Sequence, residues 1–380
     1  MVNALPPPVL MNDFVAQWRA VGDEVLDAVR RVGESGWLVL GKEVERFEAD
    51  LAARSRASHV VGVASGLDAL EIALRTAGVG PGDKVLTTPV SAFATTLAIL
   101  RLGAVPVFVD VDATGLLDLT LAGEALRRLP ETKAILPVHL FGHALDLDAL
   151  ESLAKATGVT VLEDAAQSID ARSRGRAVGS VSLAWASSFY PTKNLGAMGD
   201  AGALFTDDDG VAKRARSLRD YGQTAKYVHA ELGMNSRLDE LHAAILRTAL
   251  LPRLSASTER RRAIAKRYRD GLRNAHLSVP PAPPGSESVF HLFPVLVTRG
   301  HREAFMKHLQ AARVGSGIHY PILISDQEAL RGAEHVVVGD LTVARSFAEN
   351  EVSLPMHPFL TDADVDRVLA TCNEWRPEGT

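Results

Sequence analysis

LAWASSFYPTKNLGAMGDAGALFT, residues 183–206, places Lys193 among small residues between two apolar runs, 183–189 and 202–206. Short apolar runs of this kind are typical of buried strands. Similar runs precede this stretch and alternate with amphipathic helical patterns, which predicts an α/β fold with a mostly parallel sheet between helices. The expected strands are 84–88, 105–110, 133–139, 159–164, 183–189 and 202–206.

The same alternation indicates where the chain divides. It fades after about Ala249, where a long charged helical pattern begins, and the proline-rich VPPAPPGSES (279–288) follows. We therefore expect an N-terminal arm and a large domain over residues 1–251, and a smaller α+β domain over residues 252–380.

Composition limits the classes of function. The 380 residues are 47% hydrophobic, and the net charge of −5 gives no overall basic surface for nucleic acid or an anionic membrane. The only cysteine, Cys372, excludes an intrachain disulfide and a multi-cysteine metal site, which fits a reducing cytoplasm. The first twenty residues lack the regions of a secretory signal, and prolines and an arginine interrupt the apolar stretch 85–111. We expect a cytoplasmic protein without a membrane span.

A phosphate site is expected where one helix begins. The chain has no G-x-G-x-x-G after its first strand and no Walker A sequence, which disfavours dinucleotide and P-loop sites. Ser65, Gly66 and Leu67 instead open a helical pattern. There, glycine permits close approach, and free backbone N–H groups can hold a phosphate. The same residues also fit a plain helix cap.

Seven segments stand out along the chain, in the order GVASGLDAL, PVFVDVD, LPVHLFG, LEDAAQS, SSFYPTKNLGAMGD, GMNSRLDE and HYP. In this order they resemble the DegT/StrS family of pyridoxal-phosphate-dependent sugar aminotransferases, over about residues 35–360. The resemblance implies a large domain of the aspartate aminotransferase fold, a smaller C-terminal domain and pyridoxal 5'-phosphate as cofactor.

The resemblance assigns the catalytic roles to Lys193 and Asp164. An uncharged amine can bond to the cofactor aldehyde and later move a proton, and Lys193 fills this family position. Asp164, at the end of VTVLED, fills the position of the carboxylate that keeps the pyridine nitrogen protonated. Its neighbour Glu163 is expected on the opposite side of the strand. Without the family match, a turn lysine and a helix-capping aspartate would account for these residues.

Further cofactor contacts follow from the resemblance. Gln167 matches the residue that hydrogen-bonds the phenolic oxygen, and Ser188 matches a hydroxyl donor to the phosphate. In many relatives an aromatic ring stacks on the cofactor. Alignment through Gly103 puts Ala92 in that position and Phe93 one place later, so Phe93 is a candidate and which of the two faces the ring stays open.

The resemblance also implies a homodimer with shared active sites. Asn235, in GMNSR, matches a residue that crosses the interface to the phosphate bound at the partner's Lys193. An amide suits this task because it donates a hydrogen bond without a buried charge. A turn asparagine is the alternative.

The implied reaction transfers an amino group from glutamate to a keto sugar of a nucleoside diphosphate. Arginine suits diphosphate or carboxylate recognition because its planar donors bind two oxygens at once. Ile169 stands where several 3-keto-sugar relatives have histidine, which favours a 4-keto sugar, while HYPILIS departs from many relatives after the HYP motif. The residues expected on the substrate side are Arg219, Tyr227, His229, Arg237, His319 and Tyr320.

Alternatives stay open. An aminotransferase for a cyclitol ketone, of aminoglycoside-type biosynthesis, would retain every motif, and a non-catalytic sensor or regulatory protein could retain the binding residues. A sugar dehydratase of the same fold replaces the lysine with histidine, so Lys193 argues against it. His139 and His143 in HLFGH lack the glutamate and helical setting of a metal-binding HExxH motif, so we expect no metal.

Overall fold

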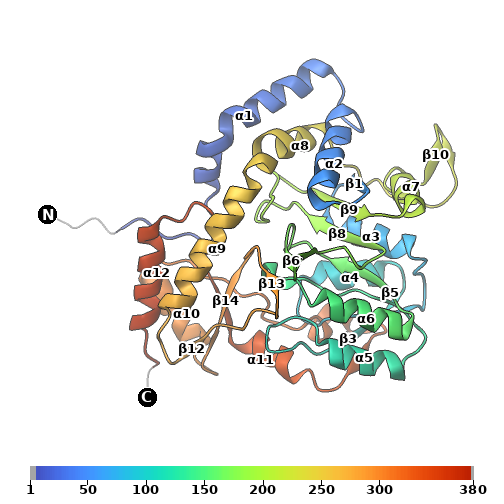
Figure 1. Cartoon of the computed structure of the whole chain (residues 1–380). Helices are drawn as coiled ribbons and strands as arrows, with labels where there is room; N and C mark the ends of the chain where they lie inside the picture. The colour runs from blue at the N-terminus through green and yellow to red at the C-terminus, as the bar shows by residue number, and fades with distance from the viewer. Residues whose placement is uncertain (1–5, 378–380) are drawn as a thin grey trace.

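An eight-stranded sheet forms the centre of the larger part of the chain in the computed structural model, which describes residues 6–377 (Figure 1). The strands lie in the order β1, β9, β8, β5, β4, β2, β3 and β15, and β9 alone runs antiparallel to its neighbours in this sheet. The expected α/β class with a mostly parallel sheet is therefore confirmed. The strands are β1 (His59–Val63), β2 (Lys84–Thr87), β3 (Val105–Val109), β4 (Thr132–Ile135), β5 (Thr160–Asp164), β8 (Ala184–Ser188), β9 (Gly202–Thr206) and β15 (Val336–Val338).

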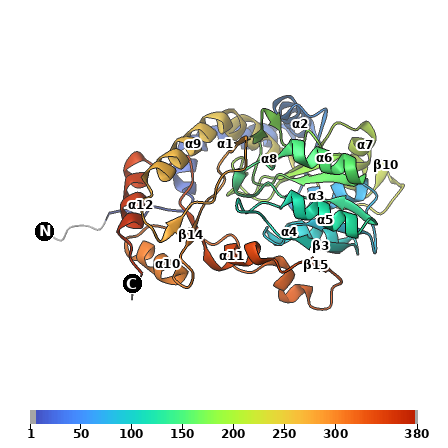
Figure 2. The same ribbon diagram turned by 60° about the horizontal axis from the view of Figure 1, so that its bottom comes forward.

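Helices cover both faces of this sheet (Figure 2). Adjacent strand residues point to opposite sides, and the residues on both sides are apolar, so both faces are buried under helices. Leu204 packs with helices α3, α4 and α7, whereas its neighbour Phe205 packs with α2 and α8. Helices α5 and α6 extend this second layer over β3, β4 and β5. The helices are α1 (Phe14–Ser35), α2 (Lys42–Ser55), α3 (Gly66–Thr76), α4 (Phe93–Arg101), α5 (Leu119–Arg128), α6 (Leu147–Thr157), α7 (Asp209–Leu218), α8 (Glu240–Ile245), α9 (Leu254–Gly271), α10 (Arg302–Ala311), α11 (Thr342–Asn350) and α12 (Asp362–Glu374).

The C-terminal part has its own core around a three-stranded antiparallel sheet in the order β12, β14, β16. Tyr268 of α9 and Phe305 of α10 are fully buried against this sheet. The two parts are interlocked, since β15 returns to the large sheet and Val9 bridges to Val314. A domain boundary near Pro252, in the short turn before α9, stays a prediction. The strands here are β12 (Leu277–Ser278), β14 (Phe293–Val297) and β16 (Glu351–Leu354).

Smaller strand pairs stand outside these two sheets. A hairpin of two strands projects from the large part beside α7 (Figure 1). Three short strands, two from the large part and one from the C-terminal part, pair with one another. Across residues 6–377, no helix has both the length and the apolar character needed to cross a membrane. The hairpin is β10 (Gln223–Ala225) with β11 (Val228–His229), and the short strands are β6 (Arg172–Ser173), β7 (Arg176–Ala177) and β13 (Ser286–Glu287).

Candidate active site

Two neighbouring parallel strands bring the expected catalytic residues to one edge of the sheet. Asp164 ends β5 and lies in register with Ala186 of β8. Ser188 ends β8, and the loop that follows carries Lys193. The carboxyl ends of parallel strands are where open α/β sheets bind ligands, so these residues lie where the topology predicts a ligand site.

The Lys193 side chain is held in a poorly solvated position. Burial lowers the pKa of its ammonium group to about 8, and the nearby charge of Asp164 opposes this shift. No hydrogen bond holds Nζ within the described part of the chain. A lowered pKa increases the fraction of free amine at neutral pH, which is the form that acts as nucleophile and proton acceptor.

Asp164 and Glu163 point to opposite sides of β5, as the strand alternation predicts. Asp164 Oδ2 accepts a hydrogen bond of 2.8 Å from Thr95 Oγ1, and Oδ1 accepts one of 3.0 Å from the backbone of Ala166. Glu163 Oε2 lies 2.6 Å from His139 Nε2 and accepts from the backbone of Gly179. The Asp164 carboxylate lies close enough to Lys193 for its charge to act on the amine, while Glu163 forms a structural pair with a histidine.

The histidines of HLFGH do not converge on a common point. His139 Nδ1 accepts a hydrogen bond from the backbone of Leu145, which leaves Nε2 as the donor to Glu163. Burial lowers the pKa of His143 to about 3, and its ring packs edge-on against Phe290. Between residues 6 and 377, no group of three or more potential metal ligands is found.

The expected phosphate site is a cradle formed by three segments. Ser65 caps helix α3, since its side chain accepts a hydrogen bond of 3.1 Å from the backbone of Asp68. A Cβ on Gly66 would lie 2.7 Å from the Ser188 Cβ, and a Cβ on Gly202 would overlap the Ser65 backbone. The glycines therefore allow the helix N-terminus, with the backbone N–H groups at its start, to approach the Ser188 hydroxyl.

Gln167 is fixed in orientation by two contacts. Its Oε1 accepts a hydrogen bond of 2.7 Å from the backbone of Phe141, and its Nε2 lies 3.3 Å from the Tyr320 hydroxyl. Because an amide nitrogen carries two hydrogens, one N–H can still be donated to a ligand. Burial raises the pKa of Tyr320, so its hydroxyl remains neutral.

A cavity of about 250 Å³ lies beside the Lys193 loop. His291 and His319 line it together with Thr192, and both histidine pKa values lie below their usual range because of burial and the nearby charge of Lys193. The His291 ring is oriented by Asn194, at 3.2 Å. Sequence reasoning identified His319 but missed His291, because no motif connects it to Lys193. The other lining residues are Met11, Asn12, Leu292, Gly317 and Met356.

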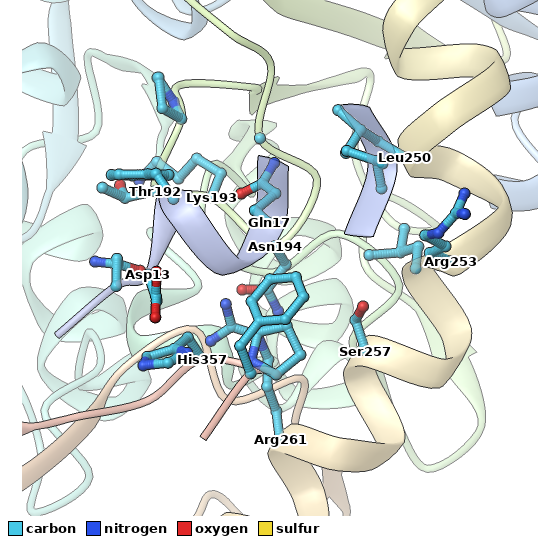
Figure 3. Close-up of a pocket in the computed structure, with 18 residues that line it drawn as sticks. Asp13, Gln17, Thr192, Lys193, Asn194, Leu250, Arg253, Ser257, Arg261 and His357 are labelled. Atoms are coloured by element: carbon cyan, nitrogen blue, oxygen red, sulfur yellow. The ribbon is translucent and has the colours of Figure 1, made fainter. Parts of the chain in front are cut away.

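A second cavity, of about 70 Å³, borders the same loop where it faces helices α1 and α9 (Figure 3). Arg261 of α9 is buried there, and its Nη1 donates to the carbonyl oxygens of Phe290, His291 and Met356. Burial lowers the pKa of its guanidinium to about 10. This arginine connects α9 to two other segments that border the site.

Three other expected residues line neither of the two cavities beside the Lys193 loop. Arg219 is buried, donating to Glu48 and to the backbone of Gly62, so its charge is used inside the fold. Tyr227 lies in the β10–β11 hairpin and is 80% exposed. His229, in the same hairpin, contacts the Tyr221 backbone.

Two residues of GMNSR contact each other at the base of that hairpin. Arg237 donates to Asn235 Oδ1 at 2.7 Å and to Asp220 at 3.0 Å. The exposed Asn235 side chain thus retains its amide hydrogens for another partner. The roles of these residues stay predictions.

The aromatic position also has a defined setting. Ala92 caps helix α4, and Phe93 is its first residue. The Phe93 ring packs against the cluster of Phe108, Ile324 and Leu330. Whether Phe93 or Ala92 faces the cofactor ring stays open.

Comparison with known proteins identifies relatives along most of the chain. Residues 19–373 match the DegT/DnrJ/EryC1/StrS aminotransferase family. The dTDP-3-amino-3,4,6-trideoxy-alpha-D-glucose transaminase of Streptomyces venezuelae is 42% identical over 98% of this chain and 97% of its own length. The UDP-N-acetyl-3-dehydro-alpha-D-glucosamine 3-aminotransferase of Acidithiobacillus ferrooxidans is 39% identical over 94% and 95%. The crystal structure of S. venezuelae DesV superposes with a TM-score of 0.93 at 42% identity, covering 97% of this chain and 99% of that one.

Proposed function

Because this chain belongs to the DegT/DnrJ/EryC1/StrS aminotransferase family, it is a pyridoxal-phosphate-dependent aminotransferase, and we propose that it transfers the amino group of glutamate to a keto sugar of a nucleoside diphosphate. The observation that carries the proposal is the buried Lys193 amine near the Asp164 carboxylate, at the edge of the sheet. The names of the two relatives supply the substrate class. We place the reaction in amino-sugar biosynthesis in the cytoplasm.

The residues present fit the cofactor by the chemistry of their donors. The N-terminus of α3 and the Ser188 hydroxyl offer hydrogen-bond donors for the phosphate. Asp164 offers a carboxylate for the protonated pyridine nitrogen, and Gln167 retains an N–H for the phenolic oxygen. When bound, pyridoxal phosphate supplies an electron sink that stabilises negative charge on the carbon next to the transferred nitrogen.

The chain's own groups divide the remaining tasks. Lys193 Nζ, with its lowered pKa, takes up and returns the proton at the reacting carbon. Thr95 holds the Asp164 carboxylate in one orientation, so its negative charge is already in place before the reaction. His291 and His319, held neutral by burial, offer hydrogen bonds to the substrate in the 250 Å³ cavity.

We propose carbon 3 as the position of the keto group. Both relatives named above are named for amination at carbon 3. The expectation of a 4-keto sugar rests on Ile169, whose side chain packs in the core with Phe47 and Phe189 and does not line the cavity. That expectation stays a prediction, which the same assay tests.

We also propose a homodimer with shared sites. Asn235, Tyr227 and His229 are exposed and line neither cavity beside the Lys193 loop of their own chain, so they are free to serve the site of a second copy. Helix α1 and the segment after it expose the large apolar side chains Trp18, Trp37 and Leu38. A second copy of this chain would remove these side chains from water.

The test is an amino-transfer assay with purified protein and added pyridoxal phosphate. The amino-group acceptors are a 3-keto sugar nucleotide, a 4-keto sugar nucleotide and a cyclitol ketone, each purified. Each acceptor is combined with glutamate or with glutamine, and release of the 2-oxo acid is measured. The proposal expects release with a 3-keto sugar nucleotide and glutamate. Release with the cyclitol ketone alone, or cofactor binding without turnover of any acceptor, contradicts it.

A further inference from the structure

Hydrogen bonds connect the ring of His319 to the buried carboxyl group of Glu351 through the hydroxyl of Ser353. His319 Nδ1 lies 2.9 Å from Ser353 Oγ, and Ser353 Oγ lies 2.6 Å from Glu351 Oε1. The other oxygen, Oε2, accepts a hydrogen bond of 2.6 Å from the His319 backbone. The three residues form a closed hydrogen-bonded loop between β16 and the segment that carries HYP.

The hydrogen-bonded loop is buried at Glu351 and Ser353, and at His319 it borders a cavity. Glu351 and Ser353 have no exposed surface, whereas His319 lines the 250 Å³ cavity beside Thr192. Its second ring nitrogen, Nε2, has no hydrogen-bond partner in residues 6–377. Nε2 is therefore the atom through which the loop can act on a ligand.

A carboxyl, a hydroxyl and a neutral imidazole in series have two self-consistent arrangements of protons. If Glu351 is protonated, Oε1–H donates to Ser353, Ser353 donates to His319 Nδ1, and the ring hydrogen is on Nε2. If Glu351 is ionised, Ser353 donates to Oε1, Nδ1–H donates to Ser353, and Nε2 has a free lone pair. Both arrangements use the same three hydrogen bonds.

We propose that Glu351 and Ser353 are positioning residues that set the tautomer of His319, so that a proton on the buried carboxyl makes Nε2 a donor toward the cavity and its loss makes Nε2 an acceptor. The step balances with one proton. Nε2 releases its proton into the cavity, Nδ1 takes the Ser353 hydrogen, and Ser353 takes the Glu351 hydrogen. The ring remains neutral throughout.

The surrounding charges agree with this exchange near neutral pH. Burial raises the pKa of Glu351 to about 8, while the hydrogen bonds from the His319 backbone and Ser353, and the nearby charge of Arg302, partly oppose the shift. Burial and the charge of Lys193 lower the pKa of His319 to about 4, so its ring does not ionise in the same range. Lys193, His291 and Tyr320 are the other titratable groups that face the loop. Burial keeps His291 and Tyr320 neutral. Lys193, whose pKa is lowered to about 8, loses its charge in the same pH range, and the Ser353→Ala variant distinguishes its effect from a change that passes from Glu351 through Ser353.

The inference rests on the site of the proposed function, but its test needs no substrate. Full-length protein is labelled with ¹⁵N in the histidine rings, and solid-state ¹⁵N spectra are recorded from pH 6 to pH 10. Protonated and unprotonated ring nitrogens have separate signals, and His319→Gln assigns those of His319 by their loss. We expect the His319 hydrogen to be on Nε2 at pH 6 and on Nδ1 at pH 10, with a midpoint near pH 8.

Two variants break the loop at different points. In Glu351→Gln, the amide oxygen can accept from the His319 backbone while its NH₂ donates to Ser353, so the hydrogen should stay on Nε2 at every pH. Ser353→Ala retains the carboxyl but removes the connection, so the change near pH 8 should disappear. Glu71→Gln is the matched control. It removes another buried carboxyl with a raised pKa, paired with Arg101, and should leave the change intact.

The tautomer measurement separates this inference from the choice of substrate. A His319 tautomer that is the same at pH 6 and pH 10 in the unaltered protein overturns it, as does a change near pH 8 that survives in Ser353→Ala. Circular dichroism checks that both variants fold, and if Glu351→Gln does not fold, Ser353→Ala and the unaltered protein decide. A failed transfer assay with an intact tautomer change would contradict only the proposed function.

Discussion

Gly66, at the start of helix α3, lies against Ser188, at the end of strand β8, with no room for a side chain between them. A Cβ on Gly66 would be 2.7 Å from the Ser188 Cβ and 3.1 Å from its Cα. Real Cβ atoms essentially never come within 3.0 Å of another heavy atom, so the first of these distances is not possible without a shift of the backbone. The absence of a side chain at position 66 therefore brings the helix N-terminus and the serine hydroxyl together.

The first prediction follows from this contact. Gly66→Ala should push α3 away from Ser188 and weaken pyridoxal phosphate binding at least ~10-fold, about 1.4 kcal/mol, as measured by titrating cofactor-free protein. Gly80→Ala is the control, because a Cβ there meets nothing within 4 Å, and it should bind the cofactor as the unaltered protein does. Equal affinities for the two variants would show that the phosphate is held elsewhere.

Lys193 should form the covalent bond with the cofactor. The purified protein should absorb visible light when loaded with pyridoxal phosphate, and borohydride reduction followed by peptide mapping should place the label on Lys193, because its burial lowers the pKa of the amine to about 8. Lys193→Ala should take up no label. A label on Lys133 or Lys226 in the unaltered protein would overturn the assignment.

Asp164→Asn should retain cofactor binding but lose at least ~10²-fold in turnover, about 2.7 kcal/mol of barrier, because the amide no longer supplies a negative charge. Steady-state kinetics with saturating cofactor measures this loss. Glu163→Gln is the matched control, since Glu163 points to the other side of β5 toward His139. Its turnover per folded molecule should be unchanged. Normal turnover in Asp164→Asn would show that this carboxylate has no part in the reaction.

Shared sites can be tested by mixing two inactive variants. Lys193→Ala lacks the amine, and Asn235→Asp places a negative charge beside the phosphate, so each homodimer should be impaired. If Asn235 serves the partner's site, a mixed dimer has one site with both defects and one site with none. Activity should then reappear after subunit exchange.

The opposite geometry gives a different result in the same experiment. If Asn235 serves the site of its own chain, every mixed dimer has one defect in each site. Activity no higher than the average of the two variant homodimers, with mixed dimers confirmed by mass spectrometry, would contradict shared sites.

Glu351 should make stability fall as the pH rises. Burial raises its pKa from 4.5 to about 8, so between these values the folded protein holds a proton that the unfolded chain releases. The stabilising contribution is complete below about pH 4.5 and is lost as the pH rises toward 8, by at most about 1.4 kcal/mol per pH unit. The thermal midpoint of Glu351→Gln should therefore fall less between pH 5 and pH 8 than that of the unaltered protein. Parallel curves for the two proteins would contradict a raised pKa.

The sequence alone determined the alternation of strands and helices in the large part of the chain. All six expected strands are present, because strands with both faces buried are short continuous apolar runs, and their length and flanking turn residues distinguish them from helices. Two strands of the large sheet were not predicted from the sequence. They are β1, whose HVVGV contains a histidine and a glycine, and β15, which is three residues long. These two strands occupy the sheet edges, where pairing with a neighbour defines a strand more than its own residues do.

The resemblance read from the sequence named Lys193, Asp164, Gln167 and Ser188 as site residues, and the structure places their segments at or after the ends of two neighbouring parallel strands, at one edge of the sheet. Their roles stay predictions. Only the tertiary structure brought His291 to the same loop and connected His319 to Glu351 through Ser353. These contacts join segments that are distant in the chain, and no local pattern encodes them. The pKa values of these groups were likewise decided by the folded chain, because burial and nearby charge exist only once the two parts have packed together.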